Sequence, residues 1–296
     1  MQKNQNRVFV VGNGMTKFYR PGKHGYEYTD LANIAMKRAL NDSKVSFETE
    51  IESVYVGWVY GDSCAGQKAV YTCGMTGVPI INVNNNCSTG STALYLAHNS
   101  IKGGENECVM ALGFEKMFTG SLKTFFDDRV NPSMDIFMKN MELRGPIKGP
   151  YAPNLFGNAG REHMEKYGTK AEHFGKIAWK NHKHSVNNPY SQFRDEYTLE
   201  QIMGSTKIYE PLTKLQCCPT SDGAACAIVC SEAFMLKHGL QDQAVEIKSI
   251  GMKTDFRSTF DTNSSINLIG GDMSKKCAQM VYEKAGIKYE DIASKV

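Results

Sequence analysis

Two hydrophobic periodicities alternate along the first 115 residues of the chain. Apolar runs typical of buried strands lie at residues 7–16, 54–60, 80–83 and 107–114. Segments with apolar residues at helical spacing lie between them, at residues 28–43, 67–73 and 88–101. In the first of these segments Leu31, Ala35 and Ala39 recur on one helical face. Strands alternating with helices predict an α/β fold in which helices cover a sheet.

The pattern changes over residues 116–220, where Met, Lys, Asn and Tyr become frequent. Helical patterns at residues 161–167 and 171–182 have no strand between them, which predicts an inserted helical loop domain. The α/β pattern then returns, with strands and helices expected at residues 223–230, 232–238, 245–252 and 273–285. We therefore divide the chain into three parts, at residues 1–115, 116–220 and 221–296.

An internal similarity links the first and third parts. The strand VFVVGNGMT near the start is similar to VEIKSIGMKT at residues 245–254, and each is followed by a linker and an Asp-led amphipathic helix. Aligning Asp30 with Asp272 places Leu31 on Met273 and Ala35 on Cys277. We therefore expect residues 221–296 to begin a second copy of the first half, and this second half to be incomplete.

Composition indicates a globular protein and argues against two classes of partner. The chain has 296 residues, 41% of them hydrophobic, which is enough to bury a sizeable core. Its 34 basic and 31 acidic residues are interspersed, with a net charge of +3, so no dense basic face is expected for nucleic acid. No run approaches the roughly 18 apolar residues of a membrane span, and the chain's first residues do not resemble a secretory signal.

The nine cysteines are expected to be reduced thiols, because most lie within apolar runs. Their spacing does not give two CxxC pairs, so we expect neither a structural zinc nor another bound metal. Cys217 and Cys218 are adjacent and could be redox-active, but packing before the sheet is the interpretation that we favour for them.

Cys87 has the sequence context of a nucleophile. The strand at residues 80–83 runs into three asparagines, then Cys87, then a Ser/Thr/Gly-rich helix start. Unpaired backbone N–H groups and the helix dipole favour a thiolate at such a position, and a thiolate is the nucleophile that acyl transfer requires. The small residues Ser88, Thr89 and Gly90 would let a substrate approach, and a backbone N–H beside the sulfur could stabilise an oxyanion.

Other interpretations of these segments remain open or fit less well. A buried structural cysteine, capped by Asn and Ser, would show the same local pattern as Cys87. The sequence has no G-x-S-x-G here, which argues against an α/β-hydrolase elbow. The run from Gly12 to Gly14 lacks the third glycine of a dinucleotide-binding fingerprint, which argues against a Rossmann-type cofactor site.

Longer segments carry a more specific signal. The runs RVFVVGNGMTKF, VGWVYGDS, GMTGVPIINVNNNCSTGSTAL, REHMEKYGTKAEHF and LQCCPTSDGAA together resemble the thiolases of the sterol carrier protein type, and the similarity extends over essentially the whole chain. The resemblance implies a layered αβαβα fold of two similar halves, with a loop domain between them that contributes to the CoA site. It also implies cleavage of 3-oxoacyl-CoA by CoA through an acyl-cysteine on the residue matching Cys87. CoA is then a substrate, and no other cofactor is expected.

The resemblance also implies partners and a location. We expect a homodimer, or a heterodimer with a full-length thiolase, and a peroxisomal protein, with the cytoplasm as the alternative. The terminal Ser294-Lys295-Val296 matches the Ser-Lys-Leu peroxisomal address imperfectly. In the loop domain His163, His182 and Lys183 are candidates for contacts with CoA. A solvated position on a helix surface is the alternative for each of them.

The sequence also departs from this family. Neither the HDCF string nor the GHP-type histidine motif of the thiolases occurs in it. Losing a group that acts as a unit with the nucleophile typically costs several powers of ten in rate, so full turnover is expected to be impaired. Two hypotheses follow: an acyltransferase in which Cys87 is acylated, and a non-catalytic isoform that binds acyl-CoA or lipid or serves as a dimer partner.

Overall fold

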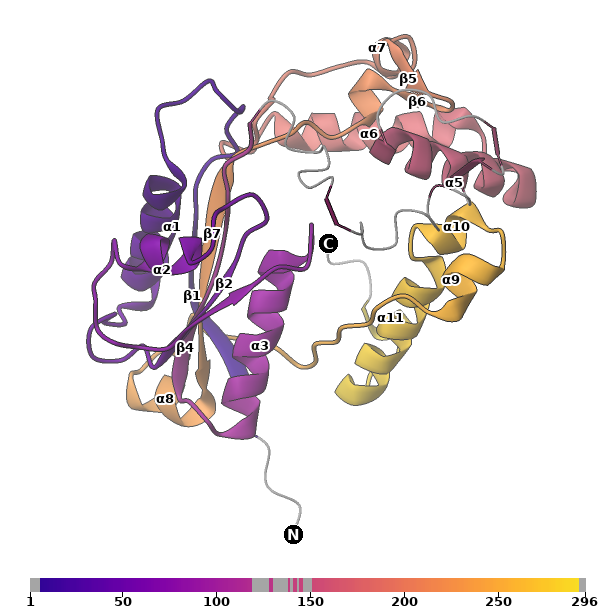
Figure 1. Ribbon diagram of the computed structural model, residues 1–296. Helices are drawn as coiled ribbons and strands as arrows, with labels where there is room; N and C mark the ends of the chain where they lie inside the picture. Colours follow the sequence, from indigo (N-terminus) through magenta and orange to yellow (C-terminus); the bar gives the residue numbers. More distant parts are fainter. Residues whose placement is uncertain are drawn as a thin grey trace. The chain divides into compact units, whose positions relative to one another are not determined.

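The computed structural model describes residues 6–118 and 151–292 and, between them, residues 128–129, 138, 141–142 and 144–145. The chain forms two compact units, each built from two stretches of sequence (Figure 1). The first unit comprises Met1–Ser121 and Thr220–Met252, and the second comprises Leu122–Pro219 and Lys253–Val296. The tripeptide Ser294-Lys295-Val296 lies outside the described residues.

A six-stranded sheet forms the centre of the first unit, in the order β3-β2-β4-β7-β1-β8. Its strands are β1 (Val8–Met15), β2 (Ser53–Gly57), β3 (Ile80–Val83), β4 (Cys108–Glu115), β7 (Gly223–Ser231) and β8 (Val245–Glu246). β2 pairs in parallel with β3 and β4, β7 is antiparallel to β4 and β1, and β8 is antiparallel to β1. The carboxyl-terminal ends of the parallel strands β3, β2 and β4 therefore lie side by side at one end of the sheet.

Helices cover both faces of this sheet, as predicted (Figure 1). They are α1 (Tyr28–Ser43), α2 (Ala65–Val70), α3 (Thr89–Gly103) and α8 (Glu232–Lys237). Successive residues of a strand point to opposite faces. In β4, Met110 and Leu112 belong to the buried cluster that contains the core residues of α1, whereas Val109 and Ala111 belong to the cluster that contains those of α3. Burial on both faces explains why the strand is apolar throughout.

The bounds of α1 match those predicted from the sequence, and local contacts explain both ends. The backbone N–H of Glu27 donates to Asp30 Oδ2 at 2.9 Å, which caps the start of the helix. Lys44 ends the helix in the left-handed conformation, with φ at 59°. α1 lies directly on β1, because a Cβ atom on Gly12 would be 2.6 Å from Ser43 Cβ. The first glycine of the GNG run thus allows close packing of this helix.

The position of β7 differs from the division expected from the sequence. Residues 221–296 were assigned to a second half, but β7 lies between β4 and β1 in the first sheet, with Val229 opposite Val109. Thr220–Met252 consequently belongs to the first unit. The strand expected at residues 245–252 pairs only over β8. An apolar run identifies a buried strand, but it does not specify which strands lie beside it.

The second unit is mainly helical. Its elements are α5 (Tyr151–Tyr167), α6 (Ala171–Ser185), α7 (Leu199–Met203), β5 (Lys207–Tyr209), β6 (Leu212–Thr213), η1 (Lys214–Gln216), α9 (Arg257–Asp261), α10 (Ser265–Leu268), α11 (Gly271–Ala285) and η2 (Tyr289–Asp291). The helices expected in α5, α6 and α11 are confirmed. The small sheet of β5 and β6 was not predicted, because strands this short show no measurable periodicity. Nowhere in the described ranges does a helix combine the length and apolar character that crossing a membrane requires.

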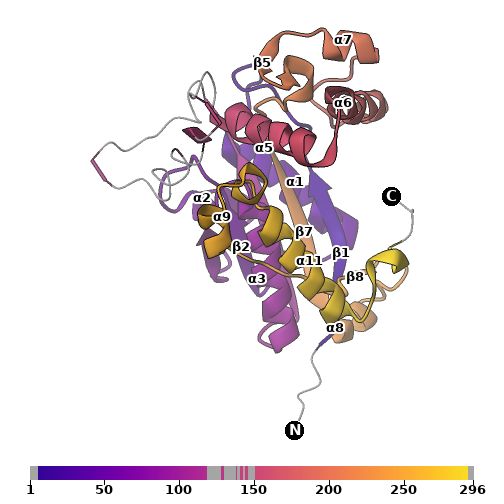
Figure 2. The ribbon, with the colours of Figure 1, turned by 90° about the vertical axis from the view of Figure 1, so that its right-hand side faces the viewer.

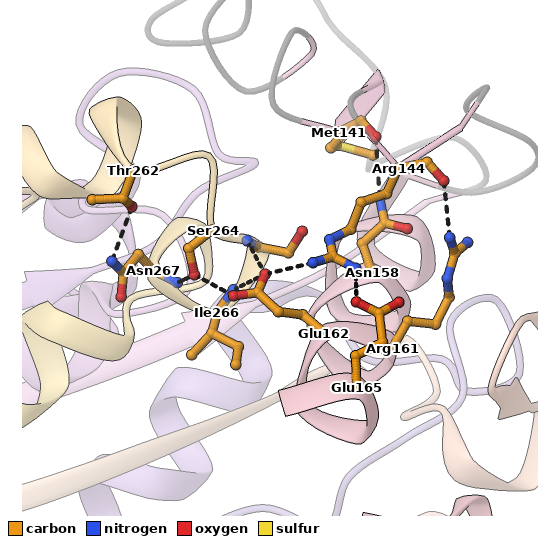
Figure 3. A network of polar contacts seen from close by, with 11 residues as sticks. Met141, Arg144, Asn158, Arg161, Glu162, Glu165, Thr262, Ser264, Ile266 and Asn267 are labelled. Atoms are coloured by element: carbon orange, nitrogen blue, oxygen red, sulfur yellow. Dashed lines mark hydrogen bonds and ion pairs between the residues drawn. The ribbon is translucent and has the colours of Figure 1, made fainter. Parts of the chain in front are cut away.

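A buried carboxylate connects the two sequence stretches of the second unit (Figure 3). Glu162 of α5 accepts hydrogen bonds from Ser264 Oγ at 2.6 Å and from the Ser265 backbone N–H at 2.5 Å. Arg144 lies 3.4 Å from the same carboxylate and 2.8 Å from Glu165. A buried charge is costly unless it is paired and hydrogen-bonded. These contacts therefore stabilise the attachment of α10 to α5.

Candidate active site

Cys87 lies in the turn between β3 and α3 and is exposed to solvent. Ser88 is the N-cap residue of α3, a helix of 15 residues, so Cys87 immediately precedes the N-cap. The first turn of a helix has backbone N–H groups without intrahelical acceptors, and it carries the positive end of the helix dipole. The placement at a helix N-terminus inferred from the sequence is confirmed, whereas a buried structural cysteine does not match the exposed side chain.

Hydrogen bonds within the turn hold Cys87 in place. Asn86 adopts the left-handed conformation, with φ at 50°, which asparagine tolerates better than most residues. Ser88 Oγ donates to the Asn85 carbonyl at 2.8 Å, and the Asn85 backbone N–H donates to Thr89 Oγ1 at 3.0 Å. The Asn, Ser and Thr residues on either side of Cys87 therefore form the turn themselves.

The three residues expected beside an oxyanion occupy different environments. Thr89 is buried, whereas Ser88 and Gly90 are exposed. The backbone N–H groups of Ser88 and Thr89 both donate within the turn at 3.1 Å, to the carbonyls of Asn85 and Asn86. They are thus engaged in the conformation described here. An oxyanion role for this segment stays a prediction.

The start of α3 lies directly on the sheet, and α3 runs along one sheet face in both ribbon views (Figure 2). A Cβ atom on Gly57, the last residue of β2, would be 2.4 Å from Thr89 Cγ2. Only glycine allows this approach without a shift of the helix. The position of Cys87 is therefore fixed by the strand end as well as by its own turn.

Tyr60 and Glu115 lie at the same carboxyl-terminal ends of the strands as the turn that contains Cys87. The sequence reasoning did not identify either residue. Burial raises the pKa of Tyr60, and the nearby Glu115 and Cys87 raise it further. Burial also raises the pKa of Glu115, partly offset by hydrogen bonds from backbone N–H groups. Their positions at the ends of two predicted strands were the only sequence signal that could have identified them.

The other cysteines differ from Cys87 in their surroundings. Of the nine, Cys64 and Cys218 are also exposed, and none forms a disulfide. Burial raises the pKa of Cys230 to about 12 and also raises the pKa of Cys108 and of Cys226. A thiol kept protonated is a poor nucleophile. Cys87 combines an exposed thiol with a place before the 15-residue helix α3, whereas the exposed Cys64 precedes only the six-residue α2.

The residues predicted to contact CoA lie in the second unit, whereas Cys87 lies in the first. His163 is exposed, and its Nδ1 is 2.8 Å from Thr169 Oγ1. His182 Nε2 donates to the Leu215 carbonyl at 2.9 Å, and the Lys183 ammonium lies over the Trp179 ring, 5.2 Å from its centroid. Each side chain has its own local partner, and their role toward CoA stays a prediction.

Metal binding has no visible basis in the part of the chain that the structure describes. There, no group of three or more His, Cys, Asp or Glu side chains is arranged to hold an ion.

A family model and two similar proteins show which family this chain resembles. The family model "Thiolase, N-terminal domain" matches residues 8–233. The chain is 55% identical to sterol carrier protein 2 of Bos taurus over 97% of its own length and 53% of that protein, so it spans about half the length of this relative. It is 43% identical to the non-specific lipid-transfer protein-like 2 of Caenorhabditis elegans, covering 99% of this chain and 72% of that protein.

A solved structure shows the same fold. The human mitochondrial 3-ketoacyl-CoA thiolase in complex with CoA aligns with a TM-score of 0.67 over 97% of this chain and 77% of that chain. The two sequences are 20% identical in this alignment, so the likeness concerns the fold alone. The expected α/β layered fold is thereby confirmed at the level of the fold class.

Proposed function

Because this chain belongs to the thiolase family, we propose that it transfers acyl groups from CoA thioesters through a covalent acyl-cysteine on Cys87. The observation that carries the proposal is the exposed thiol at the N-terminus of α3, within the segment that the thiolase model matches. Nucleophilic catalysis requires a thiol that a substrate can reach, and the exposure of Cys87 and its place before α3 support the proposal.

The proposed substrate is a 3-oxoacyl-CoA. The Cys87 thiolate attacks the 3-oxo carbonyl carbon, the bond between C2 and C3 breaks, and its electron pair leaves with the shorter acyl-CoA fragment, which takes up a proton. The remaining acyl group is held on Cys87 as a thioester. A CoA thiol that has lost its proton then attacks this thioester and releases the second acyl-CoA and the thiolate. We assign the acyl-enzyme step to Cys87 of this chain.

The names of the similar proteins support a role in lipid metabolism. Sterol carrier protein 2 and the lipid-transfer protein-like relative are named for lipids, and the human thiolase structure contains CoA. We propose fatty or branched-chain acyl groups as the substrates and the peroxisome as the location. His163, His182 and Lys183 are the residues that we propose for contacts with CoA phosphates and the pantetheine arm.

Intact-mass measurement after incubation with acetyl-CoA or a 3-oxoacyl-CoA tests the proposal. One acyl group should be added per chain, and peptide mapping should locate it on Cys87. Cys87→Ala should abolish the adduct, whereas Cys64→Ala, which removes an exposed thiol of the same unit, should retain it. Absence of an adduct on the unmodified chain would refute even the acyl-enzyme step.

A second candidate function is that of a non-catalytic dimer partner, and the edge of the sheet favours it. β3 is the terminal strand at one side of the sheet, and Ile81 within it is 37% exposed. Such an edge offers backbone groups for pairing with a second copy or with a full-length thiolase. This function predicts that Cys87→Ala leaves the biological effect unchanged, while a proline at Ile81 abolishes association.

A further inference from the structure

The positive charge of the chain is concentrated in one short segment of the second unit. Residues 166–185, which run from the end of α5 through α6, contain five lysines and one glutamate. The net charge of this segment, +4, exceeds the net charge of +3 of the whole chain, so the remaining residues are slightly acidic in total. The composition of the whole chain conceals this local excess. A basic segment of this kind attracts an anionic surface.

α6 presents its lysines on one side. Four side chains lie at positions i, i+3, i+4 and i+7 of the helix and therefore share one face: Lys176, Trp179, Lys180 and Lys183. Ile177 borders this face and is 56% exposed, and Trp179 is 39% exposed. Lys183, which we propose for contacts with CoA, ends the stripe, and its ammonium lies over the Trp179 ring. We call Lys176, Ile177, Trp179 and Lys180 the basic face of α6.

The other side of α6 is packed inside the unit. Gly175 and Ala178 are buried, and a Cβ atom on Gly175 would overlap the Met203 sulfur of α7. His182 Nε2 donates to the Leu215 carbonyl at 2.9 Å. These contacts attach the helix to its unit and leave the basic face exposed to solvent.

The charges of the basic face are only partly neutralised by neighbouring carboxylates. Lys176 Nζ is 2.8 Å from Glu172 Oε1, one turn earlier. Within the ranges that the structure describes, no ion pair joins Lys180 to an acidic side chain. Lysine can lay its methylene stem on apolar material while the ammonium stays in water, and the tryptophan ring is amphipathic in the same sense. Both kinds of side chain therefore suit a boundary between apolar material and water.

We propose that the basic face of α6 docks this chain on the surface of a bilayer that contains anionic phospholipids. The lysines lie at the level of the phosphate groups, and Trp179 and Ile177 insert between the headgroups. A free anion or an acidic peptide needs only the charges, whereas exposed tryptophan and isoleucine among lysines fit a surface that is anionic outside and apolar beneath. The proposal goes beyond the proposed function, because docking does not involve Cys87.

Co-sedimentation of the full chain with vesicles tests the proposal. The chain should bind vesicles of two parts phosphatidylcholine to one part phosphatidylserine, and it should bind vesicles of phosphatidylcholine alone far more weakly. High salt should release it. Lys180→Gln should weaken binding about fivefold, the contribution expected of one lysine near an anionic bilayer. Lys284→Gln removes the same charge at an exposed lysine of α11 in the same unit and should leave the affinity unchanged.

Fluorescence shows whether the apolar side chains of the basic face enter the bilayer. The chain has two tryptophans, and Trp58 is buried in the first unit, so a blue shift on addition of the mixed vesicles reports on Trp179. Trp179→Phe should remove this shift. Ile177→Ser should weaken binding, whereas Ile287→Ser, at another exposed isoleucine of the same unit, should not.

Equal binding to the two kinds of vesicle, or equal effects of Lys180→Gln and Lys284→Gln, would overturn the proposal. Release by sodium phosphate but not by sodium chloride of equal ionic strength would overturn it as well, because the lysines would then form a site for soluble phosphate. Circular dichroism shows whether each variant is folded, and the comparison of vesicles with the unmodified chain decides the matter if a variant is not.

The docking and the proposed acyl transfer can fail independently. Cys87→Ala should bind the mixed vesicles as the unmodified chain does, since Cys87 lies in the other unit. Lys180→Gln should still be acylated by acetyl-CoA in the absence of vesicles. Vesicle binding without acylation would refute the proposed function alone, and acylation without vesicle binding would refute the docking alone.

Discussion

Gly57 at the end of β2 contacts Thr89 at the start of α3, so closely that a Cβ atom on Gly57 would be 2.4 Å from Thr89 Cγ2. This contact places the N-terminus of α3, and with it Cys87, directly above the strand end. The reactivity proposed for Cys87 thus depends on a residue thirty positions earlier in the chain that has no side chain.

Gly57→Ala should move the start of α3 away from the sheet. Overpacking at a buried site costs about 1–3 kcal/mol, and we expect a loss of stability in this range together with slower alkylation of Cys87. Denaturant unfolding and iodoacetamide kinetics measure the two effects. Gly103→Ala is the control, because an added Cβ at this other end of α3 would meet no atom within 4 Å. It should reduce neither the stability nor the rate of Cys87 alkylation. Equal behaviour of the two variants would contradict the role of the contact.

Cysteine labelling in the native state should separate the thiols by environment. Cys87, Cys64 and Cys218 are exposed and should react at neutral pH, with Cys87 fastest because of its helix. Cys226 and Cys230 should stay unlabelled, since burial raises the pKa of both and blocks the reagent. Labelling of all nine should follow only after unfolding in urea. Native-state labelling of Cys226 at the rate of Cys87 would be inconsistent with the fold.

Glu162→Gln should loosen α10 from α5. The glutamine keeps the size of the side chain but loses the charge that pairs with Arg144 and one of the two acceptor oxygens used by Ser264 and Ser265. Loss of a buried charge-assisted contact costs about 1–3 kcal/mol. Hydrogen exchange over residues 257–268 should accelerate accordingly.

Glu165→Gln provides the matched control for this change. Glu165 also pairs with Arg144, but its side chain is 61% exposed, so its removal should have little effect. If both variants exchanged hydrogen equally fast over residues 257–268, the claim that the buried Glu162 carboxylate holds α10 on α5 would be refuted.

The pairing of Glu246 with Arg7 should make stability depend on pH in the acid range. Hydrogen bonds from Arg7 and Lys248 lower the pKa of Glu246 from 4.5 to about 2. A carboxyl with a lowered pKa in the folded chain contributes stability above the pKa of the unfolded chain, and this contribution is lost as pH falls toward the lower value. Glu246→Gln should therefore cause a small loss of stability at pH 7 that disappears by about pH 2.

Urea unfolding of the wild type and Glu246→Gln at several pH values measures this difference, which should also shrink at high salt because the pair is partly solvated. Glu105→Gln, at an exposed glutamate of the same unit, should show no such trend. A difference that grew on acidification would have the wrong sign and would refute the assignment.

Local pattern was sufficient for much of the fold. The bounds of α1 and β3 match the prediction, and β1, α3, β4 and α11 lie within a few residues of it. The placement of Cys87 at the start of α3 also followed from sequence, because strand periodicity, an asparagine turn and a Ser/Thr-rich helix start are properties of neighbouring residues. The family resemblance likewise rested on contiguous runs of residues.

Contacts between distant parts of the chain decided the rest. β7 has the pattern of a buried strand in any sheet, and only its pairing with β4 and β1 assigns it to the first unit. Glu115 contacts Tyr60 across 55 residues, and Glu162 contacts Ser264 across 102. Hydrophobic periodicity records which face of an element is covered, but not which element covers it. Partner choice depends on the sum of long-range packing and hydrogen bonding, which exists only once the chain is folded.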